Sequence, residues 1–260
     1  MLAAFFVMTF AASWALFFTA SALASGSTPG VANYPVLLAG VFAPSIVALS
    51  LTLAADGMSG VRRLLAGTVR LPRQARWFAL AAGYMLVIKL SAAVLIRATT
   101  GTWPAFGTES MFVMLVATVL STPVQAGEEI GWRGFALPRL ARTVGLAPAA
   151  IIVGVAWAAW HLPLFYLLPA ADTYHQSFLV YGLGVTAISV AMAYLYRRSD
   201  NSLLLTMLMH AAVNNTKDIV PSAGPPGGVW SLHATPVGWT SAGLMCAIAS
   251  YFLVRMRGMH

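Results

Sequence analysis

Apolar runs of about 20 residues recur along nearly the whole chain, and this repetition limits its fold more than any other feature. A helix of that length crosses the ~30 Å hydrocarbon core of a bilayer, and it satisfies its own backbone hydrogen bonds there. Hydrophobic residues make up 59% of the 260 and charged residues only 8%, whereas soluble domains carry about 25% charged residues. We therefore predict an all-α polytopic membrane helix bundle that forms a single transmembrane domain over residues 1–260.

Charges, glycine and proline clusters and run length divide the chain into membrane-spanning segments. The single cysteine, Cys246, lies in the last apolar run and can form no internal disulfide. We predict about eight transmembrane helices, at residues 2–24, 33–55, 77–97, 110–136, 146–168, 177–196, 202–219 and 237–255.

Basic residues are concentrated in every second connection between these segments. Twelve of the 15 follow this rule: Arg62, Arg63, Arg70, Arg73, Arg76, Arg133, Arg139, Arg142, Arg197, Arg198, Arg255 and Arg257. The positive-inside rule places these connections in the cytoplasm. We therefore expect a multi-pass protein of the plasma (inner) membrane with both termini in the cytoplasm. The lipid bilayer accounts for the net charge of +8, and we predict no nucleic-acid partner.

The first segment resembles a secretory signal in one respect, because it ends in the small-residue pattern Ala22-Leu23-Ala24 that a signal peptidase can cut. It lacks the cationic region that begins such signals. We expect an uncleaved first helix, and cleavage would leave the orientation of the other seven segments unchanged.

A few polar groups lie within the predicted segments, where an ionisable residue costs about 2.5–3.5 kcal/mol on insertion scales. Such a residue normally has a function or a partner. Lys89 lies in the third segment, and the sequence does not say whether it snorkels or pairs. The others belong to the fourth, fifth and seventh segments: Glu128, Glu129, Arg133, His161, His210 and Asn214.

Helix geometry indicates that these groups meet at one depth. If the fourth helix continues to about Arg142, Glu128 lies about 20 Å from the helix's cytoplasmic end. His161 lies at a similar depth, and His210 about 12–15 Å deep. We therefore predict one buried site in the cytoplasmic half of the bundle. Pro138 weighs against this continuous helix, because proline removes a helix hydrogen bond.

Spacing within each helix separates the roles of the polar residues. Glu129 and Arg133 are four residues apart in the favourable order and can form an ion pair. Glu128 points about 100° away, so it is the better candidate for a general base. His210 and Asn214 are also four apart and can direct donors at one point. Trp157 lies one turn before His161 and can pack against its ring.

Three motifs on separate segments together resemble the CAAX-protease and bacteriocin-processing (Abi) family of intramembrane endopeptidases. They are Glu128-Glu129-x-x-x-Arg133, Trp157-x-x-x-His161 and His210-x-x-x-Asn214. The resemblance covers residues 110–217, the expected core of the site, and the remaining segments match only as generic helices. The second motif usually begins with Phe, where this chain has Trp157.

The resemblance implies an endopeptidase that cuts peptide or membrane-protein substrates near the cytoplasmic face. Glu128 with His161 would activate water, and His210 with Asn214 would stabilise the oxyanion. Glu129 and Arg133 would support these groups. We prefer a metal-free reaction, since Asn is an uncommon zinc ligand but a good oxyanion donor. Zinc bound by Glu128, His161 and His210 stays open as the alternative.

Two other classes of protein remain possible from the sequence. A non-catalytic scaffold or bacteriocin-immunity protein could share the fold, because fold does not fix function. A proton-coupled transporter also uses membrane carboxylates and imidazoles. A transporter predicts inverted repeats and broken helices in both halves of the chain, and the sequence shows neither.

Overall fold

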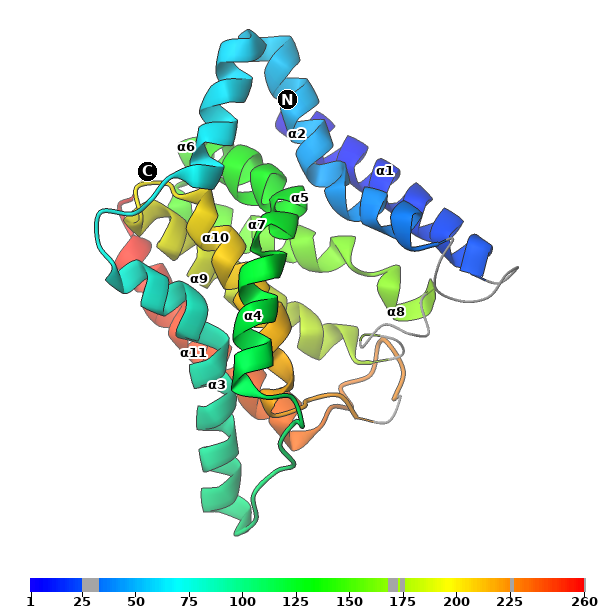
Figure 1. The fold of residues 1–260 in the computed structure, drawn as a ribbon, viewed down its shortest axis with the longest axis vertical. Coiled ribbons are helices and arrows are strands. Elements are labelled where there is room, and N and C mark those ends of the chain that lie inside the picture. Colours follow the sequence, from blue (N-terminus) through cyan, green and yellow to red (C-terminus); the bar gives the residue numbers. More distant parts are fainter. Residues whose placement is uncertain (25–32, 168–172, 174–175, 225–226, 260) are drawn as a thin grey trace.

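The computed structural model describes residues 1–24, 33–167, 173, 176–224 and 227–259. Every regular element among them is a helix (Figure 1), which confirms the all-α prediction. In chain order the elements are α1 (Leu2–Ala24), α2 (Tyr34–Ala66), η1 (Gly67–Val69), α3 (Arg76–Thr100), α4 (Met111–Ser121), η2 (Thr122–Gln125), α5 (Ala126–Glu129), η3 (Ile130–Ala136), α6 (Leu137–Val144), α7 (Leu146–Trp160), α8 (Leu164–Leu167), α9 (Phe178–Arg198), α10 (Leu203–Thr216), η4 (Lys217–Ile219) and α11 (Pro236–Met256).

Seven helical segments in the described part of the chain are long and apolar enough to cross a membrane. They correspond to all the predicted segments except the seventh, at 202–219. That segment forms α10, of only 14 residues, followed by the short 3₁₀ helix η4. The helix packs against α3, α4 and α9 inside the bundle. Residue 168, the last of the predicted fifth segment, lies outside the described residues.

The basic connections gather at one end of the bundle. Figure 1 shows both chain termini toward this same end. Arg73 lies 3.9 Å from Asp200 and joins the α2–α3 connection to the α9–α10 connection. Arg139 of α6 lies 3.7 Å from Asp56 of α2. We call this the basic end; that it faces the cytoplasm stays a prediction.

Several long helices are interrupted. The predicted segment 33–55 continues to Ala66 and bends at Gly57, whose φ of 65° suits glycine. The predicted segment 146–168 breaks after Trp160, where Pro163 follows and α8 begins at Leu164. Proline cannot donate the hydrogen bond that would continue the helix.

The predicted segment 110–136 is the most irregular, and it extends to Val144. Its residues Ile130–Ala136 form a π-helix, which ends with the Leu137 N–H bonded to the Trp132 carbonyl five residues earlier. Pro138 follows directly in the first turn of α6. The wider turn before Pro138 lets the chain continue where a regular α-helix would lose a bond. The helix therefore passes Pro138, as the depth argument required.

Close packing against α2 fixes the position of this irregular helix. A methyl group on Gly131 would lie 2.7 Å from the Pro44 carbonyl, and one on Gly127 would lie 2.9 Å from the Phe42 ring. The Ser45 hydroxyl donates to the Ala126 carbonyl at 2.6 Å. Small residues four apart allow such close helix contacts in membranes. The carboxylates between them are therefore held at a fixed height.

Aromatic rings support the same helix from the side of α1. Trp132 is fully buried and contacts Phe5 edge-on, with ring centroids 5.5 Å apart. It also meets Trp160 at the end of α7, at 6.3 Å. Rigid aromatic packing of this kind limits the movement of the helices that carry the polar residues.

Candidate active site

Four ionisable side chains from two segments form a buried cluster, which we call the carboxylate centre. Its members are Glu128, Glu129, Arg133 and His210. Glu129 is fully buried and the others are at most 6% exposed. The sequence-based expectation that the fourth and seventh segments meet is therefore confirmed. Charged groups this deeply buried must be paired and hydrogen-bonded.

Glu129 is the hub of the carboxylate centre. The Arg133 guanidinium donates to its Oε1 at 2.8 Å, which confirms the predicted ion pair. The same oxygen lies 2.9 Å from Nδ1 of His210. The sequence analysis missed this second partner, because it paired His210 only with Asn214.

Trp157 connects the centre to the second histidine. Its indole N–H donates to Oε2 of Glu128 at 2.6 Å, so Glu128 has a partner that the sequence analysis did not assign. Its ring also lies under the Arg133 guanidinium at 4.1 Å and edge-on to the His161 ring at 5.6 Å. Packing against His161 was predicted. Trp157 therefore bridges Glu128 and His161, and no direct hydrogen bond between those two is found among the described residues.

The hydrogen bond of His161 fixes its tautomer. Nδ1 lies 2.7 Å from the Trp157 carbonyl oxygen, which can only accept, so Nδ1 carries the proton. The ring is enclosed edge-on by Trp160 at 4.7 Å and Tyr181 at 5.5 Å. In the neutral ring Nε2 is then left as an acceptor, as a general base requires.

Charge balance constrains His210. With Glu128 and Glu129 ionised, the centre holds two negative charges against the single positive charge of Arg133. A protonated His210, with Nδ1 2.9 Å from the Glu129 carboxylate, would make the cluster neutral. His210 would then offer its Nε2–H as a donor.

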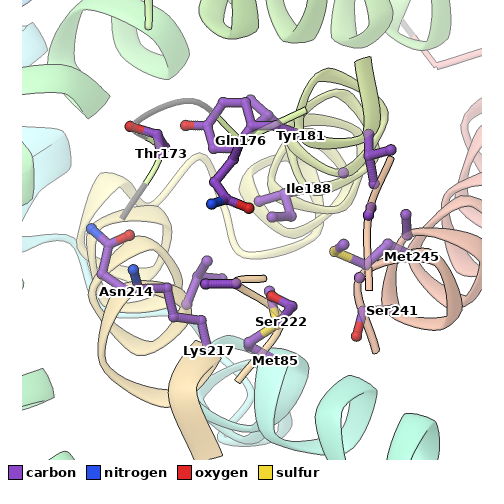
Figure 2. A pocket seen from close by; sticks show the side chains of 18 of the residues that line it. Met85, Thr173, Gln176, Tyr181, Ile188, Asn214, Lys217, Ser222, Ser241 and Met245 are labelled. Atoms are coloured by element: carbon purple, nitrogen blue, oxygen red, sulfur yellow. The ribbon is translucent and has the colours of Figure 1, made fainter. Parts of the chain in front are cut away.

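A cavity of about 380 Å³ adjoins the two histidines (Figure 2). Trp157, His161, His210 and Asn214 line it, whereas Glu128, Glu129 and Arg133 are not among its described lining residues. In Figure 2, Asn214 and Lys217 lie on one side, and Ser241 and Met245 on the other. Asn214 is exposed to this space. The two carboxylates thus lie behind the histidines.

The cavity lies in the half of the bundle away from the basic end. It is lined by the first half of α9 (Val180–Ile188), the first half of α11 (Gly238–Met245) and the last turns of α10. The predicted location in the basic half is therefore wrong for the cavity. The sequence analysis placed Glu128 and His161 about 20 Å from the cytoplasmic ends of their helices. That depth exceeds half of a ~30 Å hydrocarbon core, so it already lies beyond the bilayer centre.

The donor set does not fit a metal ion in this conformation. Among the described residues no three His, Cys, Asp or Glu side chains come close enough to share one. Of the three possible zinc ligands, Glu128 accepts from Trp157 and His210 bonds to Glu129, and neither bond joins one possible ligand to another. We therefore derive no step through zinc, and metal-free chemistry stays a prediction.

The sequence analysis missed two features of the site, and only the first has a signal in the sequence. Gly127 and Gly131, which seat the carboxylate helix on α2, are four residues apart, which is the small-residue spacing of membrane helix contacts. Tyr181 packs on His161 but had no local motif, because α9 meets α7 only in the fold.

Comparison with known proteins agrees with the motifs. The family model described as type II CAAX prenyl endopeptidase Rce1-like matches residues 108–216. CAAX prenyl protease 2 of Methanococcus maripaludis is 24% identical over 115 residues, which are 42% of this chain and 40% of that protein. The chain thus matches less than half the length of this curated relative. Over this segment, which carries all three motifs, the chain is similar to type II CAAX prenyl endopeptidases.

Proposed function

We propose that this protein is an intramembrane endopeptidase that hydrolyses peptide bonds of peptide or membrane-protein substrates. One observation carries the proposal: Trp157 joins Glu128 to His161 at the wall of a cavity that His210 and Asn214 also line. A carboxylate, an imidazole acceptor and two further polar groups beside one space are the parts that peptide hydrolysis needs. The similarity to a protein named as a protease supports the same reaction class.

In the proposed reaction, Glu128 and His161 activate the attacking water. The Nε2 acceptor of His161 takes a proton from a water molecule in the cavity, and the Glu128 carboxylate stabilises the charge that develops. Glu128 is 6% exposed, so it acts from behind the cavity wall. General bases of this kind typically contribute about 10²–10⁴ in rate.

His210 and Asn214 stabilise the oxyanion that forms when water attacks the carbonyl. When this intermediate collapses, the C–N bond breaks and His161 gives the proton that it took from water to the leaving amine nitrogen. Both are on α10, four residues apart, and both line the cavity. A protonated His210 and the Asn214 amide supply two N–H donors. Glu129 holds His210 in place through Nδ1, and Arg133 balances the charge of Glu129.

Cleavage of a quenched peptide library by the purified protein in detergent tests this function. We expect cleavage by the wild type, with and without chelator, and loss of cleavage in Glu128→Ala. A matched control is Glu109→Ala, since Glu109 is exposed and precedes α4. Thermal unfolding of each variant shows that it is folded.

Two results would overturn the proposal. Cleavage by Glu128→Ala at the wild-type rate would remove Glu128 from the mechanism. A folded wild type that cleaves no peptide in the library and no membrane-protein substrate would favour the scaffold alternative. Loss of activity with chelator, together with stoichiometric zinc by elemental mass spectrometry, would replace the metal-free mechanism.

A further inference from the structure

Lys89 is a buried cation in the middle of α3, and the proposed reaction does not use it. Its side chain lines the same cavity and the residue is only 3% exposed. Nζ donates to the Val220 carbonyl at 3.1 Å and to the Ser222 hydroxyl at 3.0 Å. An ammonium group has three donors, so these two bonds leave one.

The partners of Lys89 are neutral. No carboxylate lies within ion-pairing distance of Nζ in the part of the chain that the structure describes. Asp218 on η4 lines the same cavity and acts on Lys89 only at longer range, and it lies 3.7 Å from Lys217. A buried charge without a counter-ion is costly, and inside a membrane such residues mark binding sites.

The cavity wall strengthens the effect of this charge. The cavity wall is largely apolar, with Met85, Ile188 and Met245 among its side chains. Figure 2 shows these three around the space that Ser222 and Asn214 also border. Apolar walls exclude water, and a charge interacts more strongly where water is excluded.

The separation of Lys89 from the histidines has the scale of a short peptide. Val220, which binds Lys89, lies ten residues after His210, along the end of α10 and η4. Six α-helical steps followed by four 3₁₀ steps make this about 17 Å along the backbone. An extended peptide covers that distance with about five residues.

We propose that Lys89 and Ser222 form an anion subsite that binds a carboxylate of the substrate about five residues from the reacting bond. The carboxylate is either the free C-terminus of a peptide or an Asp or Glu side chain. This inference rests on the proposed function for its catalytic part, because both share one cavity. The carboxylate neutralises Lys89 and uses its third donor.

Direct binding tests the subsite without catalysis. The probe is acetyl-Leu-Val-Ala-Leu as the free acid, as the C-terminal amide, and as the amide with Glu in place of Ala. Calorimetry in detergent uses the wild type, Lys89→Met and Arg97→Met. Arg97→Met is the matched control, because it removes an exposed charge from the same helix.

We expect wild type and Arg97→Met to bind a carboxylate form about 10- to 100-fold more tightly than the plain amide. In Lys89→Met this ratio should fall to near one. Preference for the free acid identifies a C-terminal carboxylate, and preference for the Glu peptide identifies an acidic side chain. Equal binding of all three probes by the wild type, or an unchanged ratio in Lys89→Met, would overturn the proposal.

Cleavage kinetics then separate this inference from the proposed function. Matched quenched peptides with acid and amide ends should differ in KM in the wild type, and the difference should disappear in Lys89→Met. If the protein binds carboxylates through Lys89 but cleaves no peptide, the subsite proposal stands and the proposed endopeptidase function is contradicted. If the protein cleaves acid and amide peptides with equal KM, the endopeptidase function stands and the subsite proposal is contradicted.

Discussion

The cavity joins two polar regions that handle buried charge in opposite ways. At one end, the carboxylate centre holds Glu129 between Arg133 and His210, so that its charges compensate each other. At the other end, Lys89 has only a carbonyl and a hydroxyl as partners. In the first region opposite charges pair directly, whereas in the second the cation has no carboxylate within ion-pairing distance among the described residues.

This difference separates positioning from recognition. A cluster whose opposite charges pair directly does not need a ligand as counter-ion, so it can hold catalytic groups in a fixed geometry. An unbalanced charge gains its partner only when a ligand arrives, so it favours ligands of the opposite sign. Removing a charge from the two regions should therefore have different consequences.

The largest expected effect concerns Glu128 and His161 as one unit. We expect Glu128→Gln and His161→Ala each to lower kcat by about 10²–10⁴, and the double variant to lose little more than the worse single variant. Residues that act together in one step are not additive. Single-turnover cleavage of one quenched peptide by the three variants measures this.

If the fold-losses in kcat of the two single variants multiply in the double variant, Glu128 and His161 do not act together in one step. Glu128→Gln keeps a carbonyl oxygen that can accept from Trp157, so the fold should be preserved. An unchanged unfolding temperature in detergent confirms that only chemistry was removed.

The next effect contrasts the stability of the two regions. Glu129→Ala leaves Arg133 buried without its partner and should lower the free energy of unfolding by about 3–5 kcal/mol. Lys89→Met should change it by less than about 1.5 kcal/mol, because the lost hydrogen bonds are offset by removal of an uncompensated charge. Unfolding by SDS in mixed micelles measures both.

The double variant Glu129→Ala with Arg133→Met controls for simple cavity formation. It removes both charges and should recover part of the stability lost in Glu129→Ala. A Glu129→Ala protein as stable as the wild type would contradict the balanced-centre interpretation.

Much of the fold was predictable because membranes impose simple rules. Seven of the eight predicted spans and the clustering of basic loops followed from hydropathy and charge, as the Arg73–Asp200 contact illustrates. The irregular stretch from Thr122 to Ala136 was not predictable. Its 3₁₀ and π turns depend on close packing against Pro44 and Phe42, which lie some 80 residues earlier in the chain.

The candidate site was predictable in composition but not in connectivity. Spacing identified the Glu129–Arg133 pair because both residues are on one helix. It could not assign Glu129 to His210 or Glu128 to Trp157, since those contacts join separate helices. Lys89 looked like an isolated charge, because only the fold brings it beside Ser222 and the cavity.

A smaller effect is expected from Trp157→Phe, which deletes the indole donor to Glu128 but keeps an aromatic ring. A hydrogen bond to a charged group is typically worth about 1.5–3 kcal/mol, so kcat should fall by about 10- to 100-fold. Acid and amide peptides should be affected equally, because Lys89 is untouched. A change in their ratio would show that the two regions are coupled.

The smallest expected effect tests the contact between α2 and the helix that carries the carboxylate centre. Gly131→Ala places a methyl group 2.7 Å from the Pro44 backbone and should cost about 1–3 kcal/mol through overpacking. Gly83→Ala on α3 meets no atom within 4 Å, so it should stabilise by roughly 0.5–1 kcal/mol. Because Gly131 supports the helix of Glu128 and Glu129, its variant should lower kcat while carboxylate binding at Lys89 stays intact. Equal stability of the two alanine variants would mean that α2 and the carboxylate helix can separate, and that the height of the carboxylates is not set by this contact.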